Sequence, residues 1–91
     1  MRKTKMKDIK KMYEFLCDPT TSIKGIMFYC ECGENKATEI RQTAIAKYNG
    51  ETVYKKLVKT DSVLRVIGTT REHELKIVSQ ALKDLGRLTL N

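Results

Sequence analysis

Residues 61–86 constrain the fold most, because this stretch alone predicts two successive elements and the junction between them. A β-prone apolar run at residues 63–67 predicts a short strand. Thr69 and Glu72 have the spacing of a capping box, which marks the start of a helix. Apolar residues then recur every three or four positions, and Gly86 stands where a left-handed residue would end this helix. A strand that leads into an amphipathic helix needs partner strands, so we expect a sheet.

The first third of the chain predicts a helix followed by a strand. Apolar residues from Met6 to Cys17 fall on one stripe when they are placed at about 100° per residue, which indicates an amphipathic helix. This helix should end before Pro19, because proline disfavours helical backbone at the residue that precedes it. Residues 22–32 alternate between two sides, with apolar side chains on one of them, and therefore predict the first strand.

Residues 36–48 fit either a helix or a strand. As a helix, this segment would have Asn35 as its cap and Gly50 beyond its end. As a strand, it would close through Asn49 and Gly50, a strong hairpin signal, onto another strand at residues 52–58. We favour a strand or an extended arm, because β-prone residues follow the Asn-Gly pair almost at once.

Together these elements predict one α+β domain over residues 1–91, with residues 1–5 as a basic, flexible N-terminus. The expected architecture has two layers: a helix, an antiparallel sheet of three or four strands and a second helix, with both helices on one face of the sheet. The other face would be open to a partner. The apolar run at residues 26–29 lies on a sheet edge without a charge to protect it, so we expect a dimer with itself or with a related subunit.

The net charge of +7 is concentrated in two parts of the sequence. Residues 1–11 hold six basic residues and one acidic residue, residues 41–71 hold seven basic and two acidic ones, and the segment between them is acidic. Two separate positive regions favour a polyanionic partner, with solvated helix and sheet surfaces as the alternative. The basic side chains that we expect to bind nucleic acid on this ground are Lys55, Lys59, Arg65, Lys3, Lys7 and Lys11.

The sequence predicts no catalytic or metal centre. Cys17, Cys30 and Cys32 are an odd number of cysteines without a secretory leader, so we expect a reducing, cytoplasmic location. With His73 they could supply four zinc ligands, but alternate residues of a strand stand about 7 Å apart, which is too far to share one metal. No phosphate-binding loop, catalytic motif or membrane-spanning run is present. We therefore expect a protein that is not an enzyme and uses no cofactor, metal or small-molecule substrate.

Five segments, in the order of these elements, carry a family resemblance: FLCDP at the end of the first helix, IKGIMFYCECG as the first strand, NKATEIRQTAIAKYNG as a basic excursion, VYKKLVKTDSVLRVIGTT as a hairpin and REHELKIVSQALKDLG as the last helix. Over most of its length the chain resembles the small Alu-RNA-binding subunits of the eukaryotic signal recognition particle. The resemblance implies a sister subunit that extends the sheet. It also implies RNA contacts from Lys55, Lys59 and Arg65 on a sheet face, and from Arg41 and Lys47 before the hairpin.

We therefore expect a small RNA-binding protein that contacts phosphates through a basic sheet face, as part of a ribonucleoprotein. RNA is favoured over DNA, because shape and phosphate contacts suit a chain with few aromatic residues. The alternative is a small protein-binding regulator, of the kind that a mobile element or phage encodes, which docks on a host protein through a sheet edge or an exposed apolar residue. Phe15 lies off the apolar stripe of the first helix, and it either anchors a partner or is covered by the loop that follows. The interface residues in that hypothesis are Phe15, Met27 and Tyr29.

Overall fold

The computed structural model describes the backbone of residues 6–90 and the side chains of residues 8–85, and it is mostly helical. Within this range, five helices and two short strands follow one another: α1 (Met6–Cys17), β1 (Thr20–Thr21), α2 (Ile23–Cys30), α3 (Glu34–Tyr48), β2 (Val58–Lys59), α4 (Thr60–Val66) and α5 (Arg71–Leu90). β1 and β2 pair as an antiparallel sheet of two strands. The expected α+β fold, with a sheet of three or four strands between two helices, is therefore wrong for the described residues.

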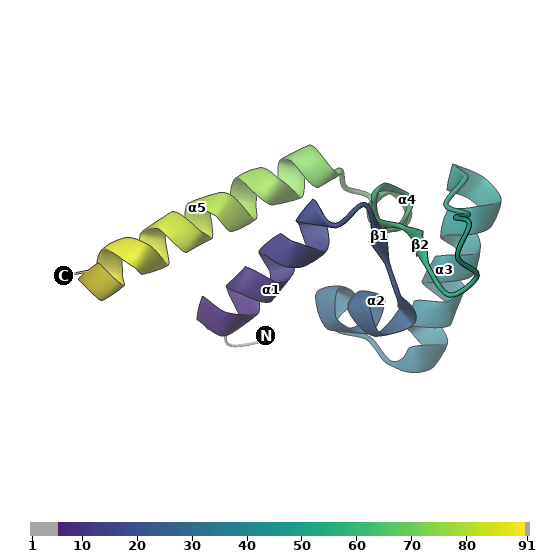
Figure 1. The fold of residues 1–91 in the computed structure, drawn as a ribbon, viewed down its shortest axis with the longest axis horizontal. Coiled ribbons are helices and arrows are strands. Elements are labelled where there is room, and N and C mark those ends of the chain that lie inside the picture. The colour runs from purple at the N-terminus through teal and green to yellow at the C-terminus, as the bar shows by residue number, and fades with distance from the viewer. Residues whose placement is uncertain (1–5, 91) are drawn as a thin grey trace.

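The molecule is elongated, with extents of 47 × 23 × 22 Å, and it has two parts. Figure 1 shows α1 and α5 side by side at one end, and α2, α3, α4 and the two strands at the other. We call the pair of α1 and α5 the arm, and the remaining elements the head. The chain enters the head after α1 and leaves it before α5, so the arm is built from segments that are far apart in the sequence.

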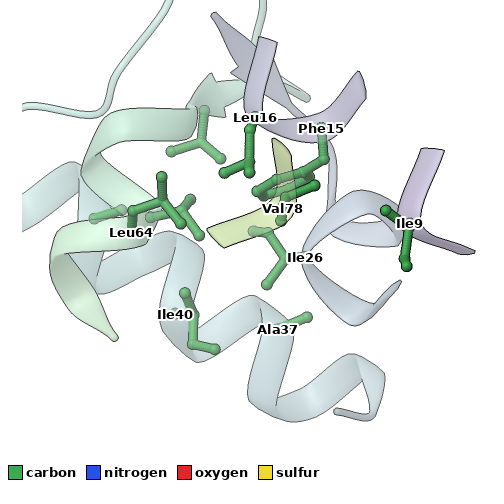
Figure 2. Packing of buried hydrophobic residues seen from close by; sticks show 11 residues of the cluster. Ile9, Phe15, Leu16, Ile26, Ala37, Ile40, Leu64 and Val78 are labelled. Carbon is green, nitrogen blue, oxygen red and sulfur yellow. The ribbon is translucent and has the colours of Figure 1, made fainter. Parts of the chain in front are cut away.

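One hydrophobic core joins the arm to the head. Figure 2 shows Ile26 of α2 in the middle of this cluster, with Val78 of α5 close to Phe15 of α1. Full burial of an aliphatic side chain stabilises a fold by about 1.5–3 kcal/mol, so these contacts hold the helices together. The large hydrophobic side chains with no exposed surface are Leu16, Ile26, Val58, Val63 and Leu64.

The predicted strand at residues 22–32 is wrong, because this segment forms α2. Ser22 has extended backbone, and its Oγ accepts a 3.3 Å hydrogen bond from the amide of Gly25, which caps the helix. The helix buries Ile26 and ends at Cys30, and it is followed by Glu31, whose backbone is left-handed with φ of 52°. The apolar run that was expected to form a sheet edge lies in this helix, so the structure gives no support to a dimer through that edge.

The segment that fits either a helix or a strand is helical and forms α3. Asn49 has a left-handed backbone with φ of 54°, and its N–H donates to the carbonyl of Ala44, which ends the helix. The Asn-Gly pair therefore caps a helix and does not close a hairpin. A Cβ on Gly50 would lie 2.9 Å from Cγ2 of Val58, so the close approach of β2 to the end of α3 requires glycine.

The strands predicted at residues 52–58 and 63–67 are wrong as well. The first region is mainly a loop, of which only the last residue belongs to β2. The second lies largely in α4. Oγ of the buried Ser62 donates a 2.8 Å hydrogen bond to the carbonyl of Tyr48, and this bond fixes α4 against the end of α3.

The first and last helices are confirmed, with a shift at the ends of the last one. α1 ends at Cys17, just before the Asp-Pro pair. α5 begins one residue later than the predicted cap indicates, because Oγ1 of Thr70 accepts a 3.2 Å hydrogen bond from the amide of His73. It also continues through Gly86 instead of ending there. Of the helices in residues 6–90, none has the length and apolar character needed to cross a membrane.

Candidate nucleic-acid interface

α2 and α3 form a helix-turn-helix unit. A turn of three residues, 31–33, connects them, with Glu31 in left-handed conformation after α2 and Gly33 in extended conformation before α3. The two helices pack against each other, and Figure 1 shows them crossing. The buried side chains of Ile26, Ala37 and Ile40 fix their relative position. In DNA-binding proteins this motif places its second helix in the major groove.

The side of α3 that faces away from the core carries polar side chains. Ala37 and Ile40 are buried, and the helical period places Asn35, Glu39 and Gln42 on the opposite, exposed side. We call these three residues the outward face of α3. Amide side chains can form paired hydrogen bonds with adenine, and a carboxylate can accept from the amino group of cytosine. The outward face therefore has the chemistry for contacts with base edges.

A hollow of about 480 Å³, whose charged lining residues are all basic, lies beside α3. It is lined by the N-terminus of α2, by one side of α3, and by the loop of residues 49–57, which leads from α3 to β2. No carboxylate belongs to the described lining of this hollow. We call it the cationic hollow, since its charged residues are Lys24, Arg41, Lys55 and Lys56.

The loop of residues 49–57 has a fixed base beside this hollow. The amide of Lys59 donates a 2.8 Å hydrogen bond to the carbonyl of Gly50, and Glu51 forms an isolated antiparallel bridge with Val58. Nη2 of Arg41 donates to a loop carbonyl, that of Lys55. The loop is therefore held against α3 at the point where both contribute charge to the cationic hollow.

Arg41 and Lys55 are the two predicted nucleic-acid-binding residues that the structure brings together. The sequence predicted each of them separately, but not their contact, because it placed Lys55 in a strand. Lys24 and Lys56 complete the hollow, and both were missed as site residues. Lys24 lay in a segment predicted as strand and within the acidic part of the sequence, so no signal pointed to it.

The other predicted basic residues with described side chains lie on α1, α3, β2 and α4, outside the described lining of the hollow. The shared sheet face expected for Lys55, Lys59 and Arg65 is wrong, because these residues belong to a loop, to β2 and to α4. The guanidinium of Arg65 instead lies 5.0 Å from the ring centroid of Tyr48. The predicted residues that are exposed elsewhere are Lys11, Lys47, Lys59 and Arg65, whereas Lys3 and the side chain of Lys7 lie outside the described part of the chain.

Of the three residues predicted as a protein interface, Phe15 is buried, and Met27 and Tyr29 are partly buried. Phe15 is only 8% exposed, and its ring stacks on that of Tyr29 with the centroids 4.4 Å apart. Oη of Tyr29 donates a 2.7 Å hydrogen bond to Oε1 of Glu74. Met27 is partly buried against the core. Phe15 is therefore covered by the protein itself and cannot anchor a partner in this conformation.

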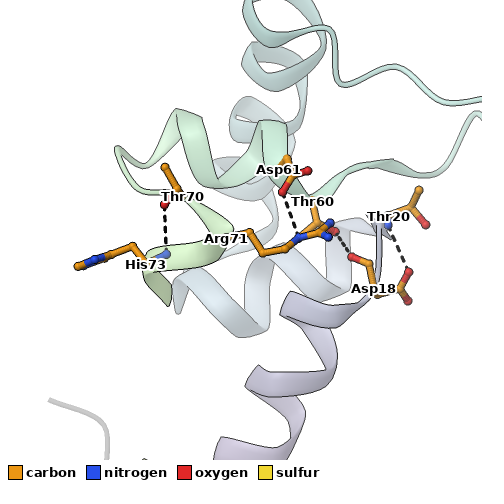
Figure 3. Close-up of polar contacts among 7 residues, drawn as sticks. All are labelled: Asp18, Thr20, Thr60, Asp61, Thr70, Arg71 and His73. Carbon is orange, nitrogen blue, oxygen red and sulfur yellow. Dashed lines mark hydrogen bonds and ion pairs between the residues drawn. The ribbon is translucent and has the colours of Figure 1, made fainter. Parts of the chain in front are cut away.

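Polar contacts fix the junction between arm and head, as Figure 3 shows. Oγ1 of the buried Thr60 donates a 2.8 Å hydrogen bond to the carbonyl of Asp18, at the end of α1. Nε of Arg71, at the start of α5, lies 3.1 Å from Oδ1 of Asp61. The N–H direction in this pair does not meet hydrogen-bond geometry, so the contact is ionic. A second hollow here mixes acidic and basic residues, which suits a polyanion less well than the cationic hollow does.

The cysteines and the histidine do not form a metal centre within the described residues, where no group of three or more potential ligands occurs. Cys17 is exposed on α1, and His73 is exposed on α5. Burial, with a smaller contribution from neighbouring Cys32, raises the pKa of Cys30 to about 11. The Cys30 thiol is therefore protonated at neutral pH, which makes it a poor nucleophile.

Comparisons with protein-family models, with curated proteins and with solved structures found no match in any of the three. The resemblance to the Alu-RNA-binding subunits is thus supported only by the sequence segments quoted above. The helix, sheet and helix order in which those segments were aligned is not adopted by residues 6–90.

Proposed function

We propose that this chain binds double-stranded DNA without catalysing a reaction, with α3 in the major groove and the cationic hollow on the adjacent phosphate backbone. The observation that carries this proposal is the position of four basic residues and no described carboxylate in a hollow directly beside the second helix of a helix-turn-helix unit. Phosphate contacts supply most of the affinity of such proteins, and base contacts supply the specificity.

The helical structure favours DNA over the RNA expected from the sequence. An α-helix with its side chains is about 10–12 Å across, and the major groove of B-form DNA is about 12 Å wide. The major groove of A-form RNA is too deep and narrow for side chains to read. RNA binding was expected through a basic sheet face, and the described residues do not form such a face.

The charge distribution on α3 fits selective contacts. Its outward face includes Glu39, and Glu34 lies in its first turn. Carboxylates there repel phosphates. This side of the helix is therefore poorly suited to contacts with the phosphate backbone of DNA and better suited to contacts with base edges. The cationic hollow, with Arg41 at its border with α3, is then the region that holds the backbone.

The alternative of a protein-binding regulator has less support, because its proposed anchor Phe15 is buried. We also propose a reducing, cytoplasmic location, because Cys17, Cys30 and Cys32 form no disulfide bond.

Binding of a fluorescent DNA duplex, measured by anisotropy at increasing salt, tests the proposal. Four phosphate contacts predict a slope of log affinity on log salt of roughly −3.6. The variant Lys24→Gln/Lys55→Gln/Lys56→Gln should make this slope shallower by about 2.7. The matched control Lys10→Gln/Lys76→Gln/Lys83→Gln removes three exposed charges from the arm and should retain the original slope.

Three results would count against the proposal. The chain could fail to bind DNA at low salt, or the two triple variants could lose affinity equally. An RNA duplex of the same sequence could also bind more tightly than the DNA, which would return the assignment to RNA.

A further inference from the structure

Two consecutive large side chains stand exposed in the loop of residues 49–57. Val53 is 92% exposed and Tyr54 is 66% exposed, the two highest values among the exposed large hydrophobic residues described. Single exposed apolar residues are ordinary on protein surfaces. These two are adjacent in sequence and are followed directly by Lys55 and Lys56 of the cationic hollow.

The backbone that carries these side chains is ordered by its own hydrogen bonds. Oγ1 of Thr52 accepts a 3.1 Å hydrogen bond from the amide of Tyr54 and donates its one hydrogen to the Tyr54 carbonyl at 2.8 Å, with the Leu57 carbonyl 3.2 Å away. The amide of Leu57 donates a 3.0 Å hydrogen bond to the Tyr54 carbonyl. Since the loop is already ordered, little conformational entropy would be lost when Val53 and Tyr54 enter a binding site.

The position of the loop indicates which part of a duplex these side chains would meet. In B-form DNA a phosphate backbone separates each major groove from the neighbouring minor groove. The cationic hollow lies between α3 and this loop, with Arg41 on one side and Lys55 and Lys56 on the other. If α3 occupies the major groove and the hollow holds the backbone, the loop lies over the minor groove.

We propose that Val53 and Tyr54 enter the minor groove beside the major groove that α3 occupies, and that they part a base step and bend the duplex. This inference rests on the proposed DNA-binding function. Apolar side chains that enter the minor groove act in this way in other proteins, by partly unstacking a step. The hydroxyl of Tyr54 can also donate to the acceptors that line the minor groove.

The inference predicts a sequence preference without base-specific contacts from the loop. Pyrimidine–purine steps such as TA unstack more easily than others, so a TA step should be favoured at the position that the loop covers. A duplex with a stiff base step at this position should bind more weakly, even if the loop forms the same contacts with the DNA phosphates.

The variant Val53→Ser/Tyr54→Ser tests this inference, with Ile77→Ser as the matched control on the arm. Ile77 is 54% exposed, so both variants remove exposed apolar surface. Bending is measured by energy transfer between dyes at the two ends of a duplex, and unstacking by the fluorescence of 2-aminopurine placed in successive steps. We expect the loop variant to bind about tenfold more weakly, a factor in the range for loss of one stacked base, with the same salt slope. It should leave the duplex straight, whereas Ile77→Ser should behave as the wild type.

A second measurement uses the wild-type protein. Netropsin, which occupies the minor groove of A·T-rich DNA, should compete with the wild type and should compete much less with Val53→Ser/Tyr54→Ser. If the loop variant bends the duplex, unstacks it and binds as the wild type does, while Lys24→Gln/Lys55→Gln/Lys56→Gln weakens binding, the minor-groove inference fails and DNA binding stands. If the wild type binds no duplex, both proposals fail.

Discussion

Oη of Tyr29 donates a 2.7 Å hydrogen bond to Oε1 of Glu74, across 45 residues of sequence and between α2 and α5. Oε2 of the same carboxylate accepts a 3.3 Å hydrogen bond from Oγ1 of Thr69, in the connection that precedes α5. The other side of Tyr29 stacks on Phe15 of α1. A single tyrosine of the helix-turn-helix unit therefore contacts both helices of the arm.

The variant Tyr29→Phe should lower the free energy of unfolding by about 1–2 kcal/mol, because it removes a partly buried hydrogen bond to a carboxylate and keeps the ring stacking. Urea denaturation followed by circular dichroism measures the change. Tyr54→Phe is the control, since Tyr54 is exposed, and it should leave the midpoint unchanged. Equal midpoints for the wild type and Tyr29→Phe would show that the hydrogen bond adds nothing to stability.

Stability should fall with rising pH above 9, with Cys30 as one cause. Burial and the neighbouring Cys32 raise the pKa of Cys30 from 9.0 to about 11, so the folded state keeps a proton that the unfolded state releases. The stabilisation is complete below pH 9 and is lost as the pH rises through 11, with a total below about 2 kcal/mol because the thiol is only partly buried. Cys30→Ser should flatten this part of the profile of unfolding free energy against pH, whereas Cys17→Ser, at an exposed position, should not.

Tyr29 adds to the same trend at higher pH. Burial and, secondly, the hydrogen bond to Glu74 raise its pKa above 10.0, so its contribution is lost only as the pH rises beyond 10. A profile for Tyr29→Phe separates it from that of Cys30. If the unfolding free energy of Cys30→Ser and of Tyr29→Phe decreases between pH 9 and 11 as much as that of the wild type, other groups cause the decrease.

Gly25→Ala in α2 and Gly33→Ala in the turn before α3 form a matched pair. A Cβ on Gly25 would lie 2.1 Å from Oγ1 of the buried Thr21 and 3.6 Å from Phe15, whereas a Cβ on Gly33 would meet nothing within 4 Å. Gly25→Ala should destabilise the fold by about 1–3 kcal/mol because the Thr21 side chain must move. Gly33→Ala should change stability by less than about 1 kcal/mol. Thermal unfolding of both variants measures the difference, and equal melting temperatures would contradict the packing around Gly25.

The outward face of α3 should determine sequence preference. Asn35→Ala and Gln42→Ala should each weaken binding to the preferred duplex by about 1–3 kcal/mol at one base pair and leave the salt slope unchanged. Selection from a pool of random duplexes, carried out with the wild type and with each variant, shows which base pair loses its preference. Ala46→Ser, on the same exposed side of the helix, provides a control. Unchanged preference in both alanine variants would mean that this face does not read bases.

The sequence predicted α1 and the start of α5 because their signals are local: a helical period that stops at Pro19 and a threonine cap followed by acidic residues. The prediction for the middle of the chain was wrong because its sequence signals are compatible with both a helix and a strand. The β-prone residue types of α2 suit a strand, but Ser22 supplies a cap and Ile26 is buried on a helical face. Asn49 in left-handed conformation serves a helix end as well as a hairpin.

The candidate site was predicted only in part, because it depends on a contact between distant residues. Charge indicated Lys55 and the family resemblance indicated Arg41; the two are 14 residues apart and meet only when the loop folds back on α3. Lys24 joins them because α2 packs on α3, and no short-range pattern contains that information. The sequence left Phe15 as either an anchor for a partner or a residue covered by the loop after α1, and it did not predict the contact with Tyr29 of α2, whose ring stacks on it.

The hydrophobic core shared by the arm and the head determines which truncated fragments of the chain can fold. A fragment that ends at Gly68 would keep the helix-turn-helix unit and the cationic hollow, but it would lack Val78 and the rest of α5, which packs on α1 and completes the shared core. Residues 6–90 should therefore unfold as one cooperative unit, and a folded fragment that contains the helix-turn-helix unit cannot be obtained by removing the last helix. A fusion partner is better joined beyond the arm than inserted between the arm and the head.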